Sequence, residues 1–284
     1  MWLTGSWPRA LLVRKARLGV ISVKNYKQCT RTQRQMLAEA ARVSHLTLTN
    51  EHGPLLYLLG PIMDGDTGFE HALQYVPTYG DVVKFLAQAR AHYFPTMLLS
   101  TYPHNVLVEY WMGAHDLWQD PKLRMWQNWQ RTAARRMFVK KPIEEYEGPT
   151  LAEFAADLMR AGGYVAVGAH GEQDGIGTHW EAWTLGLAVT PLDVLRAASL
   201  NGAHFLGLEK RARLSRKGKL ADLVVLNSNP LDNIRNTTDN LYVIKAGSLF
   251  KTDTLQQVWP KNELYGTTPW RHEDIYRTDT RSPE

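Results

Sequence analysis

The chain has 284 residues, 44% of them hydrophobic, which is enough to bury a substantial core in one large domain or in one domain with a small satellite. The formal net charge is +5, and because no nucleic-acid-binding motif accompanies the basic clusters, we expect no nucleic-acid partner. The single cysteine, Cys29, excludes an intramolecular disulfide framework and a four-cysteine zinc site. No apolar run approaches the roughly 18 residues of a membrane span, so we expect no membrane association.

The first residues of the chain do not have the pattern of a signal peptide. Residues 1–23 contain Trp2, Trp7 and several cations, without an uninterrupted apolar stretch or a small-residue cleavage site. We therefore expect an irregular start over residues 1–18. The sequence does not indicate a subcellular compartment, and we take the cytoplasm as the default expectation.

From residue 19 onward, short apolar runs alternate with helical patterns. Five runs predict buried strands, at 19–25, 46–49, 67–71, 96–100 and 164–168. Helices are predicted between them at 30–42, 55–59, 81–90 and 151–159, with Thr30, Asp81 and Thr150 as N-caps. Strands that alternate with helices in this way are typical of a parallel βαβ array.

Two further regions complete the chain. An aromatic and basic insertion at about 102–146 separates the fourth and fifth predicted strands. Later, Thr190 as N-cap and Pro191 in the first turn predict a helix start, and Gly207 closes that helix. Strands are predicted at 219–226 and 242–244 with a turn at 245–248, and a loosely held polar tail follows residue 260.

Side chains capable of metal binding or acid–base chemistry follow most of the predicted parallel strands. In a parallel array the loops after the strands converge at one edge of the sheet, where function collects. The residues concerned are Lys24, Asn50, Glu51, His52, Glu70, His71 and His170. Their coincidence at strand ends predicts a metal or acid–base site.

Each of these side chains also has a structural interpretation. Lys24 can be a surface lysine whose stem lies along apolar residues, and His71 can be a hydrogen-bonded loop histidine. Glu51 or His52 can cap the following helical turn. His170 stands in a glycine-rich loop where a large polar ring is harder to explain structurally, so we favour a functional role for it.

The tail of the chain resembles a known family. Segments 218–226, 229–235 and 242–250 are similar to the end of the metal-dependent amidohydrolase superfamily, in which the last barrel helix leads into strands of a small β-sandwich. This resemblance implies an α/β fold with an incomplete (β/α)8 TIM-like barrel of about strands 4–8. The implied boundaries are 19–207 for the partial barrel, 208–260 for the β-sandwich strands and 261–284 for a flexible tail.

The resemblance also implies metal-ligand roles. Lys24 lies in a segment similar to barrel strand four, where a lysine, often carboxylated, can bridge two metal ions. Glu51 or His52 stands at the strand-five position, where a histidine ligand is usual. His71 ends a segment similar to strand six, whose terminal histidine is a metal ligand in many members.

The loop at 168–181 occupies the strand-eight position of the superfamily. It resembles loops in amidohydrolases that are fused, in larger proteins, to a β-propeller similar to the TolB protein. His170 stands where the superfamily has its proton-accepting aspartate, so His170 and the nearby Asp174 are the catalytic candidates. We assign His179 to the substrate site, and we interpret both His179 and Glu181 as residues that support the site or begin a helix.

The implied chemistry is hydrolysis by metal-activated water. A divalent metal lowers the pKa of a bound water towards about 7 and polarises the carbonyl under attack, and a side chain then moves a proton to the leaving amine. Nitrogen and oxygen ligands suit one or two Zn²⁺ ions best, with Mn²⁺, Fe²⁺ or Ni²⁺ as alternatives. A carboxylated Lys24 would bridge a metal pair.

The sequence therefore predicts a metal-dependent hydrolase of a small molecule, cleaving an amide or cyclic amide C–N bond other than a peptide bond. The superfamily's strand-one His-X-His pair does not occur in the chain, so we expect a fragment with impaired activity. The alternatives are a dipeptidase-like hydrolase and an inactive scaffold that binds a partner through the insertion at 102–146. Five strands of eight would leave open sheet edges, which predicts marginal stability, a homo-oligomer or a need for a separate N-terminal half.

Overall fold

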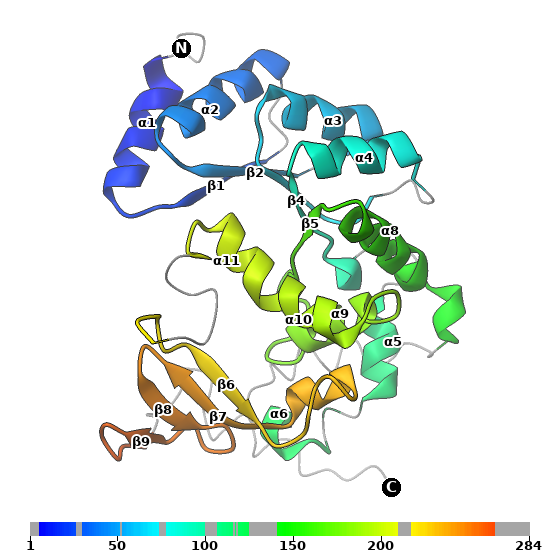
Figure 1. The fold of residues 1–284 in the computed structure, drawn as a ribbon, viewed down its shortest axis with the longest axis vertical. Helices are drawn as coiled ribbons and strands as arrows, with labels where there is room; N and C mark the ends of the chain where they lie inside the picture. The colour runs from blue at the N-terminus through cyan, green and yellow to red at the C-terminus, as the bar shows by residue number, and fades with distance from the viewer. Residues whose placement is uncertain are drawn as a thin grey trace, which may run out of the picture.

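The computed structural model describes residues 6–26, 30–51, 53–73, 78–99, 107–115, 117, 119–124, 141–209 and 217–264. Within these residues the chain forms a five-stranded sheet and a four-stranded sheet. In the view of Figure 1 the first lies in the upper part of the molecule and the second in the lower part, with helices between and around them. None of the helices described is long and apolar enough to cross a membrane.

The larger sheet is entirely parallel, and its strands follow one another in chain order. It consists of β1 (Ser22–Asn25), β2 (Thr47–Glu51), β3 (Gly68–Glu70), β4 (His92–Phe94) and β5 (Tyr164–Val165). Sequential parallel strands joined by helices are the pattern of a (β/α) barrel wall, and β1 and β5 are the two edges of this wall. The predicted incomplete barrel is thus confirmed.

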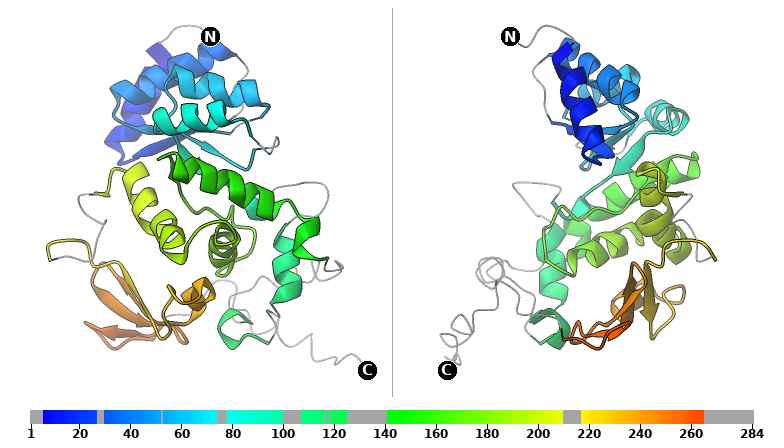
Figure 2. Two further views of the ribbon diagram at one scale, coloured as in Figure 1. Left: turned by 45° about the vertical axis from the view of Figure 1, so that its right-hand side comes forward. Right: turned by 90° about the vertical axis from the view of Figure 1, so that its left-hand side faces the viewer.

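Helices cover one side of the parallel sheet (Figures 1 and 2). They are α1 (Ser6–Arg17), α2 (Arg31–Val43), α3 (Leu55–Asp64), α4 (Gly80–Gln88) and α8 (Gly148–Arg160). The core between helices and strands includes side chains that are 0% exposed, namely Leu58, Phe69, Leu86, Tyr93 and Leu158. Helix α1 differs from the irregular start expected for residues 1–18, because Leu12 (2% exposed) anchors it in a small second core.

The predicted helix starts are borne out where a side chain caps the helix. Thr30 forms a capping box with Gln33 at α2, since each side chain accepts a hydrogen bond from the other residue's backbone N–H. Thr190 caps α10 (Pro191–Arg196). The caps predicted at Asp81 and Thr150 are wrong, because α4 and α8 begin earlier, at Gly80 and Gly148.

The fourth strand lies before the segment predicted for it. Strand β4 is His92–Phe94, whereas Met97–Leu99, placed in a strand at 96–100, forms the 3₁₀ turn η1. Thr96 has φ 44°, which ends the extended conformation. The apolar run at 97–99 is buried against helices instead of within the sheet.

On the other side of the parallel sheet lies a second group of helices. It comprises α5 (Leu107–Ala114), α6 (Pro121–Arg124), the 3₁₀ turn η2 (Ile143–Glu145), α9 (Gly177–Leu185), α10, the π-helical turn η3 (Ala197–Asn201) and α11 (Gly202–Phe205). Helix α11 reaches β4, where Phe205 packs on Phe94 with ring centroids 4.9 Å apart. His204 of α11 also stacks on His92, with His92 Nε2 and His204 Nδ1 2.8 Å apart. The inner faces of β4 and β5 are therefore covered.

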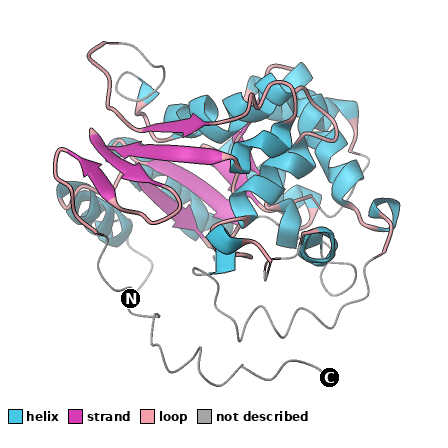
Figure 3. Ribbon diagram, turned by 90° about the horizontal axis from the view of Figure 1, so that it is seen from below, coloured by secondary structure: helices cyan, strands magenta, loops and turns pink. Residues whose placement is uncertain are grey.

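The small sheet is antiparallel and lies at the opposite end of the molecule from α1 to α4 (Figure 1); Figure 3 views the molecule from below, the end at which this sheet lies. Its strands are β6 (Leu223–Leu226), β7 (Asn240–Lys245), β8 (Ser248–Lys251) and β9 (Gln257–Trp259), with the 3₁₀ turn η4 (Ile234–Thr238) before β7. Ala246 (φ 48°) and Gly247 (φ 83°) make the predicted turn between β7 and β8, and positive φ at both positions is typical of a two-residue type I′ hairpin turn. The last part of the predicted tail, 265–284, lies outside the described residues.

Candidate active site at the carboxyl ends of the parallel strands

The strand register brings four polar side chains to one face of the sheet. Lys24 pairs with Thr49, and Glu51 pairs with Glu70. Side chains at paired positions of neighbouring strands project to the same face, and Thr49 and Glu51 are two residues apart on one strand. All four therefore meet near the carboxyl ends of β1, β2 and β3.

Lys24 is the cation at the centre of this group. Its Nζ lies 2.6 Å from Glu70 Oε2 and 3.2 Å from Glu51 Oε2. Thr49 Oγ1 donates to Glu70 Oε1 at 2.6 Å. Partial burial lowers the pKa of Lys24, but the hydrogen bonds and charges of the two carboxylates outweigh that effect and raise the pKa overall.

His71 joins the group from the residue directly after β3. Its Nε2 lies 3.6 Å from Glu51 Oε2, and its Nδ1 lies 2.8 Å from Thr96 Oγ1. Burial lowers the pKa of His71, and the charge of Lys24 adds to the decrease, so the ring favours its neutral form. A neutral imidazole held at Nδ1 presents Nε2 to the site.

His170 lies beside His71, with ring centroids 5.2 Å apart. Its Nδ1 is 3.2 Å from Oε1 of Glu172, a carboxylate whose side chain is only 7% exposed, whereas the His170 side chain is 44% exposed. The Nδ1 atom of His170 is thus held by Glu172, and the ring is accessible to solvent near the carboxyl ends of the strands.

Strained backbone marks the same edge of the sheet. His71 (φ 75°), Thr96 (φ 44°) and His170 (φ 56°) are non-glycine residues in the left-handed region, and they follow β3, β4 and β5. Such a conformation is unfavourable, most of all for a β-branched residue such as threonine. Strained residues persist where the surroundings hold them, and they cluster at functional sites.

The structure thus brings together Lys24, Glu51, His71 and His170, as the sequence predicted for their strand ends. His52 lies outside the described residues. Asp174 is exposed in the loop before α9. His179 Nδ1 lies 3.1 Å from Thr237 Oγ1 of η4, so its described polar contact is with the small sheet's connection. The roles assigned to Asp174 and His179 stay predictions.

Two members of the site have no role assigned from the sequence. Glu70 was noticed at its strand end but given no role, although its position directly before His71 was a usable signal. Thr96 had no signal in the sequence, because the segment that contains it was predicted as a strand. Its contact with His71 arises from the β3–β4 register and the turn after β4.

The donor atoms of this site fit part of a metal centre. Two ligands about 2.1 Å from a tetrahedral ion are about 3.4 Å apart, and Glu51 Oε2 and His71 Nε2 are 3.6 Å apart. In the described part of the chain, however, no group of three His, Cys, Asp or Glu side chains is arranged to hold an ion. Lys24 contacts Glu51 as an ammonium group. The residues present therefore fit two ligand positions and not a complete set.

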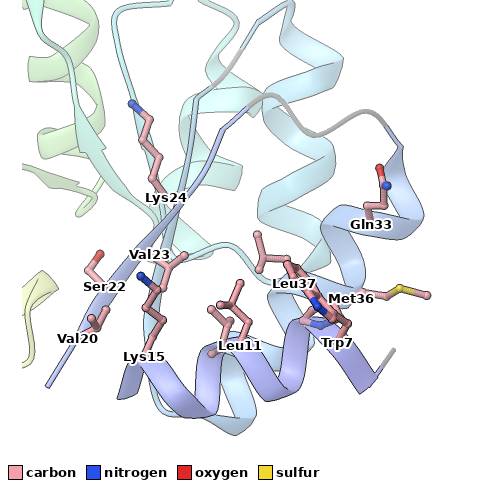
Figure 4. Close-up of a pocket in the computed structure, with 12 residues that line it drawn as sticks. Trp7, Leu11, Lys15, Val20, Ser22, Val23, Lys24, Gln33, Met36 and Leu37 are labelled. Atoms are coloured by element: carbon pink, nitrogen blue, oxygen red, sulfur yellow. The ribbon is translucent and has the colours of Figure 1, made fainter. Parts of the chain in front are cut away.

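An apolar cavity of about 470 Å³ lies next to β1. Leu11 of α1, Val23 of β1 and Leu37 of α2 line it, and Figure 4 shows the Lys24 side chain extending away from these three residues. The cavity is therefore on the helix side of the β1 edge, whereas the ammonium group of Lys24 belongs to the polar site.

Comparisons with known proteins agree with this architecture. The profile of the Amidohydrolase family matches residues 182–250. Among solved structures, a Xaa-Pro dipeptidase with bound methionine in its active site superposes with a TM-score of 0.62 at 16% identity, over 87% of this chain and 58% of that chain. A putative prolidase from Bifidobacterium longum superposes with a TM-score of 0.60 at 18% identity, over 96% of this chain and 63% of that chain. An A. niger ochratoxinase superposes with a TM-score of 0.59 at 19% identity, over 86% of this chain and 54% of that chain.

The chain spans between 54% and 63% of the length of these three proteins. No curated protein matches it by sequence. At these identities the structural likeness concerns the fold, and the fold matches the partial barrel inferred from the tail. Residues 182–250 match the profile of the Amidohydrolase family, and the chain resembles these solved structures in fold, an incomplete TIM-like barrel.

Proposed function

We propose that this chain is the C-terminal part of a metal-dependent hydrolase that cleaves an amide or cyclic amide C–N bond other than a peptide bond. The observation that carries the proposal is the convergence of Glu51, His71 and His170 at one edge of the parallel sheet. These side chains come from three strand ends far apart in the sequence, and two of them stand on strained backbone.

Each side chain has a distinct task in this proposal. Glu51 Oε2 and His71 Nε2 would supply two ligands to a divalent ion, for which Zn²⁺ is the first choice from the donor types. The ion would supply an activated water and polarise the carbonyl. Thr96 fixes the orientation of the His71 ring. His170 Nε2, the ring nitrogen opposite the one held by Glu172, takes a proton from the attacking water and passes it to the leaving amine. Without a metal, Lys24 offsets part of the negative charge of Glu51 and Glu70; carboxylation of its amine would replace this cation by an anionic metal ligand.

The test is zinc binding by the purified chain, measured by isothermal titration calorimetry, with His71→Ala as the variant. We expect the variant to lose at least tenfold in affinity. His45→Ala is the matched control, since His45 is also a non-glycine residue with positive φ (54°) but stands before β2, at the opposite end of the strands. Zinc affinity that is the same in both variants would contradict the proposal.

A non-catalytic scaffold is the second candidate, and one observation favours it. Lys24 contacts the carboxylates of both Glu51 and Glu70, so the chain's own residues already offset part of the negative charge that a metal ion would otherwise offset. This candidate predicts no stoichiometric zinc and no turnover of any amide. A dipeptidase-like activity, suggested by the Xaa-Pro dipeptidase among the similar structures, predicts turnover of proline dipeptides above that of non-peptide amides.

A further inference from the structure

A buried carboxyl group lies behind the candidate active site. Glu181 lies on α9 and is 0% exposed. Its Oε1 accepts from the Met97 N–H at 2.7 Å, and its Oε2 accepts from the Leu98 N–H at 3.0 Å. Burial raises the pKa of Glu181 to about 8, although both hydrogen bonds act in the opposite direction. A carboxyl group kept in the core at this cost needs an explanation beyond packing.

The two N–H groups belong to the start of η1, the turn that follows Thr96. The first N–H groups of a helical turn lack partners within it, and a carboxyl group whose two oxygens accept from two of them fixes the turn in place. Thr96 closes the same turn, since its carbonyl accepts from the Leu99 N–H at 3.1 Å. The anchoring of η1 by Glu181 therefore holds Thr96 in its unfavourable conformation (φ 44°).

Thr96 in turn contacts the candidate metal ligand. Its side chain is buried (6% exposed), and its Oγ1 lies 2.8 Å from His71 Nδ1. A hydrogen bond at one ring nitrogen fixes the orientation of the ring. With Nδ1 held at the Thr96 hydroxyl, Nε2 faces Glu51 Oε2, 3.6 Å away.

We propose that Glu181 is a positioning residue of this site, which fixes the orientation of the His71 ring through η1 and Thr96. The consequence for metal binding rests on the proposed function, whereas the positioning itself does not. Glu181 comes from α9, 84 residues beyond Met97, so it couples the second group of helices to the strand ends.

The first experiment is heteronuclear NMR of the ring nitrogens in metal-free protein, with the His71 signals assigned by their loss in His71→Gln. Glu181→Gln removes one of the two acceptor oxygens. Thr96→Val removes the hydroxyl, and Thr96→Ser keeps it. Thr184→Val is the matched control, because Thr184 is 0% exposed on the same helix and accepts from Trp111 Nε1 at 3.0 Å, away from η1.

We expect one set of His71 ring signals, with the same chemical shifts, in the wild type, in Thr96→Ser and in Thr184→Val. Glu181→Gln and Thr96→Val should shift or broaden these signals, because the ring is no longer held in one orientation. A folded Glu181→Gln protein with an unchanged His71 spectrum would overturn the proposal, and so would a Thr184→Val protein with the same change. If Glu181→Gln does not fold, the same His71 spectra are recorded for Glu181→Asp, whose shorter side chain moves the carboxyl group away from η1.

The second experiment is a zinc titration of the same variants by calorimetry. Glu181→Gln should bind zinc about tenfold more weakly than the wild type, and Thr184→Val should bind it equally well. If the wild type binds no zinc, the proposed function fails, and the NMR comparison still decides whether Glu181 positions His71.

Discussion

The parallel sheet and the antiparallel sheet are built from similar short apolar strands, but the two sheets differ in how their side chains are buried. Phe69 of β3 and Tyr93 of β4 are 0% exposed and stack with ring centroids 4.7 Å apart. In β6, by contrast, Val224 is 56% exposed and Val225 is 39% exposed. The parallel sheet has helices against it, whereas the small sheet is attached mainly through η4 and α9. An apolar strand sequence therefore predicts that a sheet forms, and the neighbouring elements decide how much of it is buried.

The candidate site lies on the part of the parallel sheet that α11 does not cover. Helix α11 covers β4 and β5 with His204 and Phe205, and the polar side chains stand on β1, β2 and β3, outside that cover. Lys24 there is 35% exposed at its side chain, and Glu51 is 12% exposed. Partial cover gives a site both a solvent opening and side chains held by packing.

The largest difference between the sheets should appear when a core ring is removed. We expect Phe69→Ala to lower the free energy of unfolding by about 3–5 kcal/mol, because it leaves a cavity against Tyr93. The equivalent truncation in the small sheet, Val224→Ala, should cost less than about 1 kcal/mol at its exposed position. Urea denaturation measures both, and equal losses would show that the small sheet is as well packed as the large one.

The next largest effect concerns a carboxyl group buried under the parallel sheet. Burial raises the pKa of Asp66 from 3.8 to about 7, against a hydrogen bond from Asn25 Nδ2. The folded state keeps this proton after the unfolded state has lost it, so stability falls as pH rises from about 4 to about 7. Since a tenfold change in proton affinity is worth about 1.4 kcal/mol, the loss is on the order of 4 kcal/mol.

Asp66→Asn should remove this dependence, since an amide does not ionise. Unfolding measured between pH 4 and pH 8 should show the variant gaining on the wild type as pH rises, with the gain complete above pH 7. A difference between the two proteins that is independent of pH would refute the buried neutral carboxyl.

A smaller effect is expected at the attachment of the small sheet. Trp183 Nε1 on α9 lies 3.1 Å from both the Ile234 carbonyl and Thr237 Oγ1 of η4. Trp183→Phe removes this donor and should cost about 1–2 kcal/mol. Hydrogen exchange should show faster opening of β7 with little change in β3. Equal acceleration in both sheets would mean that the molecule opens as one cooperative unit.

The smallest effect on stability should come from the β6 edge, where we propose that the chain self-associates. An exposed apolar edge strand is a template for pairing with another chain, and a lysine blocks it. Val224→Lys should change stability by less than about 0.5 kcal/mol but shift the chain towards monomer in sedimentation velocity. Leu231→Lys is the control, since Leu231 is 50% exposed in the loop before η4 and not on the strand. A wild-type chain that is already monomeric would refute the proposal.

Much of the fold could be predicted because its signals are local. The capping box of Thr30 and Gln33 lies within four consecutive residues, and the Ala246-Gly247 turn depends on its own backbone preferences. The strand ends that carry Lys24, Glu51 and His71 were also found, because parallel strands joined in sequence must place their carboxyl ends at one edge.

The tertiary structure alone decided the contacts within that edge. The register placed Glu70 against Lys24 and Thr49, and packing ended β4 at Phe94 so that Thr96 could meet His71. Glu181 reached η1 only because α9 folds back under the strand ends. Local sequence thus determined most of the strands and helices, though not β4 or α1, and the strand ends that carry polar side chains. Hydrogen-bond partners depend instead on register and on distances between segments far apart in the chain, and these are set when the whole core packs together.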